Sequence, residues 1–169
     1  YHNGKTMIAE RFAVEHLRRA DRQRVWMIQT REGAGLSHFY ASILSGLRAP
    51  QAVGWRSLSR ASEQVDHLLD SLKPRLLIFD EFHSALRGRR QDVKAIFSFL
   101  RRIARVHDIS PVLVGEIAVY DALHDTEEMG SRFDTVAVPR WGFDEDFATL
   151  LDSLEASMPL AHASNLSRP

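Results

Sequence analysis

The sequence predicts a three-layer α/β domain built on a mainly parallel sheet. Short, almost wholly apolar runs alternate with longer stretches whose apolar residues recur at helical spacing. Strands that are apolar on both faces are typical of parallel sheets covered by helices. One such run, at residues 75–81, ends in the adjacent carboxylates of Asp80 and Glu81. Because open α/β sheets bind ligands beyond the carboxyl ends of their strands, we expect the functional site at this tip.

The composition limits the kind of protein and the kind of site. Lysine plus arginine and aspartate plus glutamate both number 22, so the chain is formally neutral and any nucleic-acid contact must come from a local patch. There are no cysteines, which excludes disulfides, thiolate zinc sites and cysteine nucleophiles. No run of about 18 apolar residues and no signal peptide is visible, so we expect a cytoplasmic protein without a membrane partner.

Asn3-Gly4-Lys5-Thr6 matches the second half of a phosphate-binding loop, G-x-x-x-x-G-K-[ST]. In such a loop Lys5 would reach the β- and γ-phosphates of ATP, and Thr6 would ligate Mg²⁺. Asp80 would hold the ion from the opposite side, and Glu81 would polarise the attacking water. An ordinary helix start would also explain a lysine after a glycine, but the Asp-Glu pair at a strand tip favours the nucleotide site.

Both ends of the chain look cut. Counting back from Gly4 places the first glycine of the loop before Tyr1, and the strand that normally precedes such a loop would lie further upstream. We therefore expect a fragment of a core that cannot hydrolyse ATP by itself.

The first half of the chain predicts two helices around one strand. Residues 5 to about 20 have apolar positions at helical spacing, which places a helix N-terminus under the phosphates. Residues 25–29 are a short β-rich run that predicts a strand. A glycine-containing loop at 33–35 leads into a helix at 36–47, which Ala49-Pro50 ends.

The middle of the chain is organised around the strand at 75–81. An amphipathic helix at 57–72 precedes it. Residues 83–90 contain a glycine and three arginines, which predicts a loop at the same edge of the sheet. Residues 92–106 predict a helix with one apolar and one arginine-rich face.

The last third predicts two more strands. Residues 111–115 form a buried strand that ends in Gly115 and Glu116, and a helix follows at 117 to about 123. Residues 135–138 predict a final strand, stopped by a proline. A helix begun by an aspartate is expected at 143–154.

Two groups of arginines are candidates for contact with DNA or with a neighbouring subunit. The alternative for both groups is a solvated surface, which is the more frequent fate of arginines on helices and turns. The groups are Arg87, Arg89 and Arg90 in the expected loop, and Arg101, Arg102 and Arg105 on the expected helix.

Five segments carry a resemblance to a known family: Asn3 to Phe12, Leu77 to His83, Gly130 to Phe133, Pro139 to Trp141, and Leu150 to Leu160. In order and spacing they resemble the TniB/TnsC group of AAA+ transposition ATPases, over essentially the whole chain. Many P-loop ATPases share the first two segments, whereas the Arg-Phe, Pro-x-Trp and Pro-Leu elements at these separations are more specific.

The resemblance implies an ATP-dependent regulator of DNA transposition that assembles as a homo-oligomer on target DNA. It would couple a target-selection protein to the transposase of the same transposon, with ATP and Mg²⁺ as cofactors. It implies the AAA+ core of the P-loop NTPases, with strand order 5-1-4-3-2. Residues 1–169 would be a partial core of this kind, with a helical lid further downstream. By this analogy Asn3, Gly4, Lys5 and Thr6 bind nucleotide, and Thr6 and Asp80 bind Mg²⁺. Glu81 and Arg132 would be catalytic, the latter as an arginine finger on the neighbouring subunit's nucleotide.

Three positions allow more than one interpretation. Glu116 stands after Gly115 where the family usually has a threonine that senses the γ-phosphate, and a carboxylate near phosphate is repelled unless magnesium or arginine intervenes. Arg132, beside Phe133, could be an ordinary surface arginine. His83 makes an Asp-Glu-x-His pattern similar to a helicase box, but a histidine that hydrogen-bonds behind the site is favoured.

Three function classes fit the sequence. The first is the transposition ATPase. The second is a P-loop kinase, which would not need a glutamate beside Asp80, so Glu81 argues against it. The third is a nucleotide-gated DNA-binding scaffold with little turnover, which Glu116 favours. ATP hydrolysis measured with and without duplex DNA separates the three.

Overall fold

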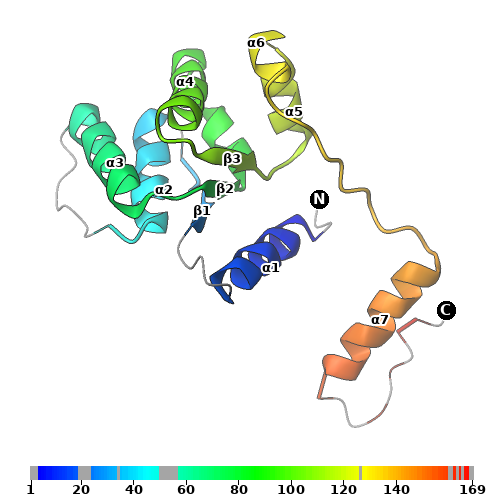
Figure 1. The fold of residues 1–169 in the computed structure, drawn as a ribbon. Coiled ribbons are helices and arrows are strands. Elements are labelled where there is room, and N and C mark those ends of the chain that lie inside the picture. Colours follow the sequence, from blue (N-terminus) through cyan, green and yellow to red (C-terminus); the bar gives the residue numbers. More distant parts are fainter. Residues whose placement is uncertain are drawn as a thin grey trace. The chain divides into compact units, whose positions relative to one another are not determined.

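The computed structural model describes residues 4–18, 24–33, 35–49, 57–125, 127–159, 162, 164 and 166–167. They group into two compact units, the first ending at Thr135 and the second beginning at Val136 (Figure 1). Asn3, which the sequence assigns to the phosphate loop, lies outside the described residues.

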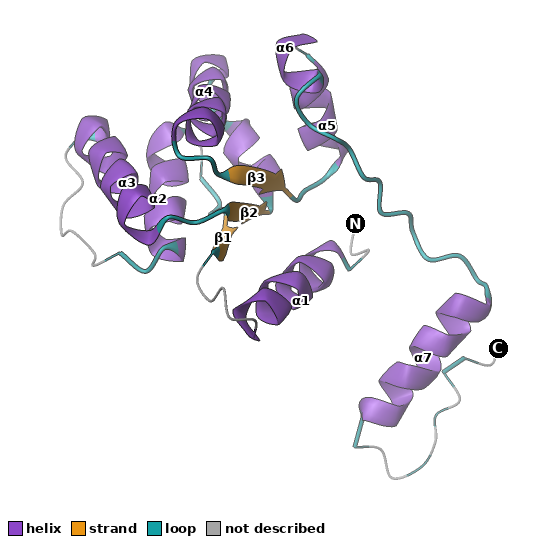
Figure 2. Ribbon diagram, in the orientation of Figure 1, coloured by secondary structure: helices purple, strands orange, loops and turns teal. Residues whose placement is uncertain are grey.

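The first unit contains a sheet of three parallel strands in the order β1-β2-β3 (Figure 2). These are β1 (Val25–Gln29), β2 (Leu76–Asp80) and β3 (Ser110–Leu113). The central strand β2 is buried at four of its five residues, as its continuous apolar sequence requires. The parallel sheet predicted from the apolar runs is therefore confirmed for these three strands. The burial predicted for the strand at 111–115 is wrong, because β3 is an end strand of the described sheet and its residues are exposed or half-buried.

Helices lie on both faces of this sheet. Successive side chains of a strand point to opposite faces, so Ile78 faces one way and Leu77 and Phe79 the other. Ile78 packs against Ala9 and Ala13 of α1, whereas the opposite face is covered by residues of α2, α3 and α4 (Figure 1). The helices of this unit are α1 (Lys5–Arg18), α2 (Leu36–Gly46), α3 (Leu58–Leu72), α4 (Arg90–Val106), α5 (Ile117–His124) and α6 (Glu127–Gly130).

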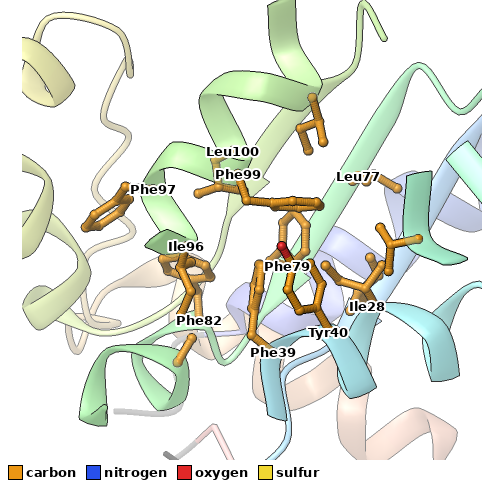
Figure 3. Packing of buried hydrophobic residues seen from close by; sticks show 14 of the residues in the cluster. Ile28, Phe39, Tyr40, Leu77, Phe79, Phe82, Ile96, Phe97, Phe99 and Leu100 are labelled. Atoms are coloured by element: carbon orange, nitrogen blue, oxygen red, sulfur yellow. The ribbon is translucent and has the colours of Figure 1, made fainter. Parts of the chain in front are cut away.

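Aromatic rings fill the core beneath the tip of β2 (Figure 3). Phe39 of α2 stacks on Phe79, with ring centroids 5.5 Å apart, and meets Phe99 of α4 edge-on at 5.6 Å. Phe82 meets Phe79 edge-on at 6.1 Å. Such pairs contribute about 0.5–1.5 kcal/mol each beyond the burial of their area. Because Phe79 and Phe82 flank Asp80 and Glu81, the same packing fixes the backbone that carries the two carboxylates.

The loop predicted at 83–90 is wrong in part. Residues Phe82–Arg87 form a 3₁₀ helix, η1, directly after β2. Phe82 and Ala85 recur at a spacing of three residues, which places them on the same side of a 3₁₀ helix, and both are buried. The glycine and the three arginines of this segment favoured a loop, although the segment also contains this spacing. Gly88 and Arg89 link η1 to α4.

The strand predicted at 135–138 is also wrong. These residues form no strand, and Val136 is 85% exposed. A β-rich sequence becomes a strand only where another strand pairs with it and where its apolar side chains are covered. The neighbours of the three described strands are those that the expected order 5-1-4-3-2 gives to its second, third and fourth strands.

The second unit contains α7 (Glu145–Ser157). As the sequence predicts, Asp144 begins this helix, and its side chain accepts a hydrogen bond of 2.9 Å from the backbone N–H of Phe147. The helix runs three residues beyond the predicted end.

Candidate functional site

The first turn of α1 meets the C-terminal tip of β2. The Thr6 hydroxyl donates a hydrogen bond of 2.9 Å to Oδ2 of Asp80, which is 1% exposed. Gly4 precedes the helix with φ of 78°, a left-handed conformation that favours glycine. The carbonyl of Gly4 accepts the first hydrogen bond of the helix, from the N–H of Ile8 at 3.0 Å. The chain thus turns sharply at Gly4 and brings Thr6 to the buried carboxylate.

Lys5 is the first residue of α1 and is half-buried beside Thr6. The unpaired N–H groups of a helix N-terminus favour anions, and a lysine at the same end adds a positive charge. The structure therefore brings together Gly4, Lys5, Thr6 and Asp80, four of the residues that the sequence assigns to nucleotide and metal.

The donor set of this site suits magnesium held jointly with phosphate. Hydroxyl and carboxylate oxygens are hard ligands, and Mg²⁺ is usually bound by one or two carboxylates together with waters and substrate phosphates. In the described part of the chain, no group of three histidine, aspartate or glutamate side chains lies close enough to hold a metal ion. Thr6 and Asp80 fit an ion that arrives with a nucleotide rather than a separate protein-bound metal.

Glu81 follows Asp80 in a conformation that is unusual for a residue with a side chain. Its φ of 53° lies in the left-handed region, which costs about 1–3 kcal/mol for such a residue. Two hydrogen bonds to the peptide group that follows Glu81 hold it there: the N–H of Ser84 donates to the Glu81 carbonyl, and the N–H of Phe82 donates to the Val114 carbonyl, each at 2.9 Å. This bend ends β2 and leaves the Glu81 side chain 47% exposed at the tip.

His83 lies between Glu81 and Glu116. Its side chain is 10% exposed, with Nδ1 3.4 Å from Oε2 of Glu81 and Nε2 3.9 Å from Oε1 of Glu116. The sequence predicts a hydrogen-bonding histidine here, but Nδ1 of His83 makes no hydrogen bond within the described residues, and its approach to Glu116 was not predicted. The pairing of parallel strands could have indicated this approach. Because β3 pairs with β2, the residues that follow the two strands lie at the same edge of the sheet.

A family model described as "Bacterial TniB protein" matches residues 1–143. The chain belongs to the TniB family. It is the family named from the five segments; four of them lie within residues 1–143, and the match does not cover the fifth, Leu150 to Leu160. Membership indicates a transposition-related, NTP-binding protein. A search of curated proteins found no match. Among the described residues, no helix has the length and apolar character needed to cross a membrane.

Arg132 lies in the turn that follows α6 of this TniB-family chain. Its backbone N–H donates to the carbonyl of Met129 at 3.1 Å, and Met129 is buried. The turn is thereby anchored to the core, while the Arg132 residue itself is exposed. The structure presents this arginine at the surface of the unit.

The arginines of the two groups differ in how they are engaged. On α4, Arg102 forms an ion pair of 2.6 Å with Asp66 of α3 and lies over the ring of Phe99, 5.3 Å from its centroid. Arg102 therefore joins two helices and serves the fold. Arg89 and Arg90, in contrast, are exposed and line an open hollow of about 480 Å³ together with Gln91 and Lys94.

We predict that Thr6→Val lowers the free energy of unfolding by about 1–3 kcal/mol, because it removes the donor to a buried carboxylate. Thr6→Ser keeps the hydroxyl and should cost much less. Thr135→Val, at an exposed position, is the control for the change of residue type. Urea titration of the four proteins measures the effect, and equal stabilities of the valine and serine variants at position 6 would show that this hydrogen bond is not significant.

Proposed function

We propose that the chain is an ATP-binding and ATP-hydrolysing regulator of DNA transposition. In this proposal it assembles on target DNA and couples the target-selection protein to the transposase of its transposon. The observation that carries the nucleotide part is the hydrogen bond from Thr6 to the buried Asp80, because it joins a phosphate-loop sequence to an Asp-Glu strand tip. Membership of the TniB family supports the connection to transposition.

Each site residue has a role that follows from its position. Lys5, with the N-terminus of α1, would bind the β- and γ-phosphates. Thr6 and Asp80 would hold Mg²⁺, which neutralises charge that develops on the phosphates. Glu81, exposed at the strand tip, would orient and deprotonate the attacking water.

A second candidate is a nucleotide-gated DNA-binding scaffold with little turnover. Glu116 favours it, because this carboxylate follows β3 at the same edge of the sheet as Asp80 and Glu81. A third negative charge near the γ-phosphate would oppose nucleotide binding unless another group compensates for it.

We predict that Glu81→Gln, made in the complete chain, retains ATP binding but lowers kcat by about 10²-fold or more. The substitution removes the base while keeping the contacts to phosphate and Mg²⁺. Steady-state hydrolysis and binding of a fluorescent ATP analogue measure the two effects, and Glu63→Gln on α3 is the exposed control. Near-normal turnover in Glu81→Gln would rule out this role, whereas negligible turnover in the unmodified chain, with ATP-dependent DNA binding, would favour the scaffold.

The exposed Arg132 suits a residue that acts on the nucleotide of a neighbouring subunit. We predict that Arg132→Ala binds ATP and assembles but hydrolyses ATP about 10³-fold more slowly, the effect expected of an arginine finger. Mixing it with Lys5→Ala subunits should restore part of the activity, because some interfaces then combine an intact Lys5 with an intact Arg132. Arg140→Ala, another exposed arginine, is the control. Absence of rescue at every mixing ratio would contradict a shared site.

The hollow at the start of α4 is the best candidate for contact with DNA. Arg89, Arg90 and Lys94 place three positive charges around it. Contacts of this kind bind phosphates, act locally and carry little sequence information. Arg102 is withdrawn from the candidate DNA surface, because Asp66 and Phe99 already engage it.

We predict that Arg89→Ala, Arg90→Ala and Lys94→Ala each weaken binding to duplex DNA about equally for all sequences. Each should also reduce the slope of log affinity against log salt by about 1 if the residue contacts one phosphate. Arg60→Ala, an exposed arginine on α3, is the matched control. Fluorescence anisotropy at several salt concentrations measures both quantities, and unchanged slopes in all three variants would place the DNA surface elsewhere.

A further inference from the structure

Glu116 lies against the residues that follow β2 because the backbones there approach closely. The carbonyl of Val114 accepts a hydrogen bond from the N–H of Phe82 at 2.9 Å. A Cβ at Gly115 would lie 3.3 Å from the backbone nitrogen of His83 and 2.7 Å from Cγ2 of Val119. Glycine at 115 therefore lets the segment leading to Glu116 pass directly beside His83.

The imidazole of His83 occupies the space between two carboxylates. Nδ1 is 3.4 Å from Glu81 and Nε2 is 3.9 Å from Glu116, so each ring nitrogen has one carboxylate as its neighbour. Nδ1 is also buried and makes no hydrogen bond within the described residues, since its approach to Glu81 lacks hydrogen-bond geometry. Buried polar atoms are nearly always satisfied in native proteins, so a small movement of the Glu81 side chain toward the ring would be favourable.

The hydrogen-bonding capacities of the three side chains allow His83 to connect Glu81 with Glu116. Carboxylates only accept hydrogen bonds, whereas a neutral imidazole donates from one nitrogen and accepts at the other. Each ring nitrogen faces one carboxylate, so a proton on either nitrogen can be donated only to the carboxylate beside it, and both carboxylates act on the same ring. Changing one carboxylate must then alter how the ring holds the other.

We propose that His83 is a positioning residue that links Glu81 to Glu116, so that Glu116 acts on the water-activating carboxylate through the imidazole instead of contacting the γ-phosphate. This inference rests on the proposed role of Glu81 in ATP hydrolysis. It also explains how a carboxylate is accommodated at position 116, because a hydrogen-bond donor lies between it and Glu81.

The first test compares turnover with nucleotide affinity in the complete chain. His83→Ala should lower kcat about 10-fold or more with little change in the Kd for ATP, because a displacement of about 1 Å in a reacting group can cost about 10²-fold. His83→Asn keeps a donor and should recover part of the loss. A fall in ATP affinity with unchanged kcat, or no effect on either, would overturn the proposal.

The chain offers a matched control for the loss of a buried histidine. His107, 9% exposed, has its Nδ1 3.0 Å from Oδ1 of Asp70, and it follows α4 at the opposite, N-terminal end of β3. His107→Ala removes a similar pair and should leave kcat unchanged. An equal loss of kcat in His107→Ala would indicate a general structural effect and overturn the proposed role of His83.

The second test asks whether Glu116 acts through His83. Glu116→Gln should change kcat in the unmodified chain but have little further effect in a His83→Ala background, because the link is already broken there. Independent, additive effects of the two substitutions would overturn the proposal.

The third test does not depend on hydrolysis. In ¹⁵N spectra of the histidine rings, with the His83 signals assigned from their loss in His83→Asn, Glu81→Gln and Glu116→Gln should each shift those signals, and Glu63→Gln should not. Unchanged His83 signals in both variants would overturn the link even in an active ATPase. Shifted signals in a chain that never hydrolyses ATP would support the link and overturn the proposed function instead.

Discussion

The hydrogen bond between Thr6 and Asp80 is the interaction on which the site depends. It joins residues 74 positions apart in the sequence and connects the first turn of α1 to the centre of the sheet. A carboxyl group that is 1% exposed needs hydrogen-bond partners nearby, and the Thr6 hydroxyl supplies one. Thr6 and Asp80 are also the residues proposed to hold Mg²⁺, so the contact that stabilises the protein would also position its ligands.

The position of Asp80 is in turn set by the aromatic core. Phe79 and Phe82 are fully buried on either side of the two carboxylates and pack against Phe39. This packing holds the end of β2 rigidly enough to maintain Glu81 in a left-handed conformation, which an isolated peptide would rarely adopt. The segment that carries the two carboxylates is thus also part of the core, and the burial of Phe79 and Phe82 offsets the backbone strain at Glu81.

Residues of the same type have different roles in this molecule because their surroundings differ. Arg102 and Arg90 both belong to α4, yet Arg102 is engaged by Asp66 and by the face of Phe99, whereas Arg90 lies at the rim of an open hollow. Similarly, His107 pairs with Asp70 outside the site, while His83 lies between two carboxylates at the tip of the sheet. Charge and residue type alone do not distinguish these cases.

The sequence by itself determined the parallel strands β1 and β2, the principal helices, and the pairing of a phosphate-loop sequence with Asp80 and Glu81. These features are local: they follow from continuous apolar runs, helical spacing and a short motif. The tertiary structure decided what depends on contacts between distant segments. Residues 135–138 have a β-rich sequence but form no strand. Phe82 and Ala85 turn an expected loop into a 3₁₀ helix through their burial, and the pairing of β2 with β3 brings Glu116 to His83. Strand pairing, burial and the meeting of side chains from separate strands are properties of the folded chain, and no local pattern encodes them.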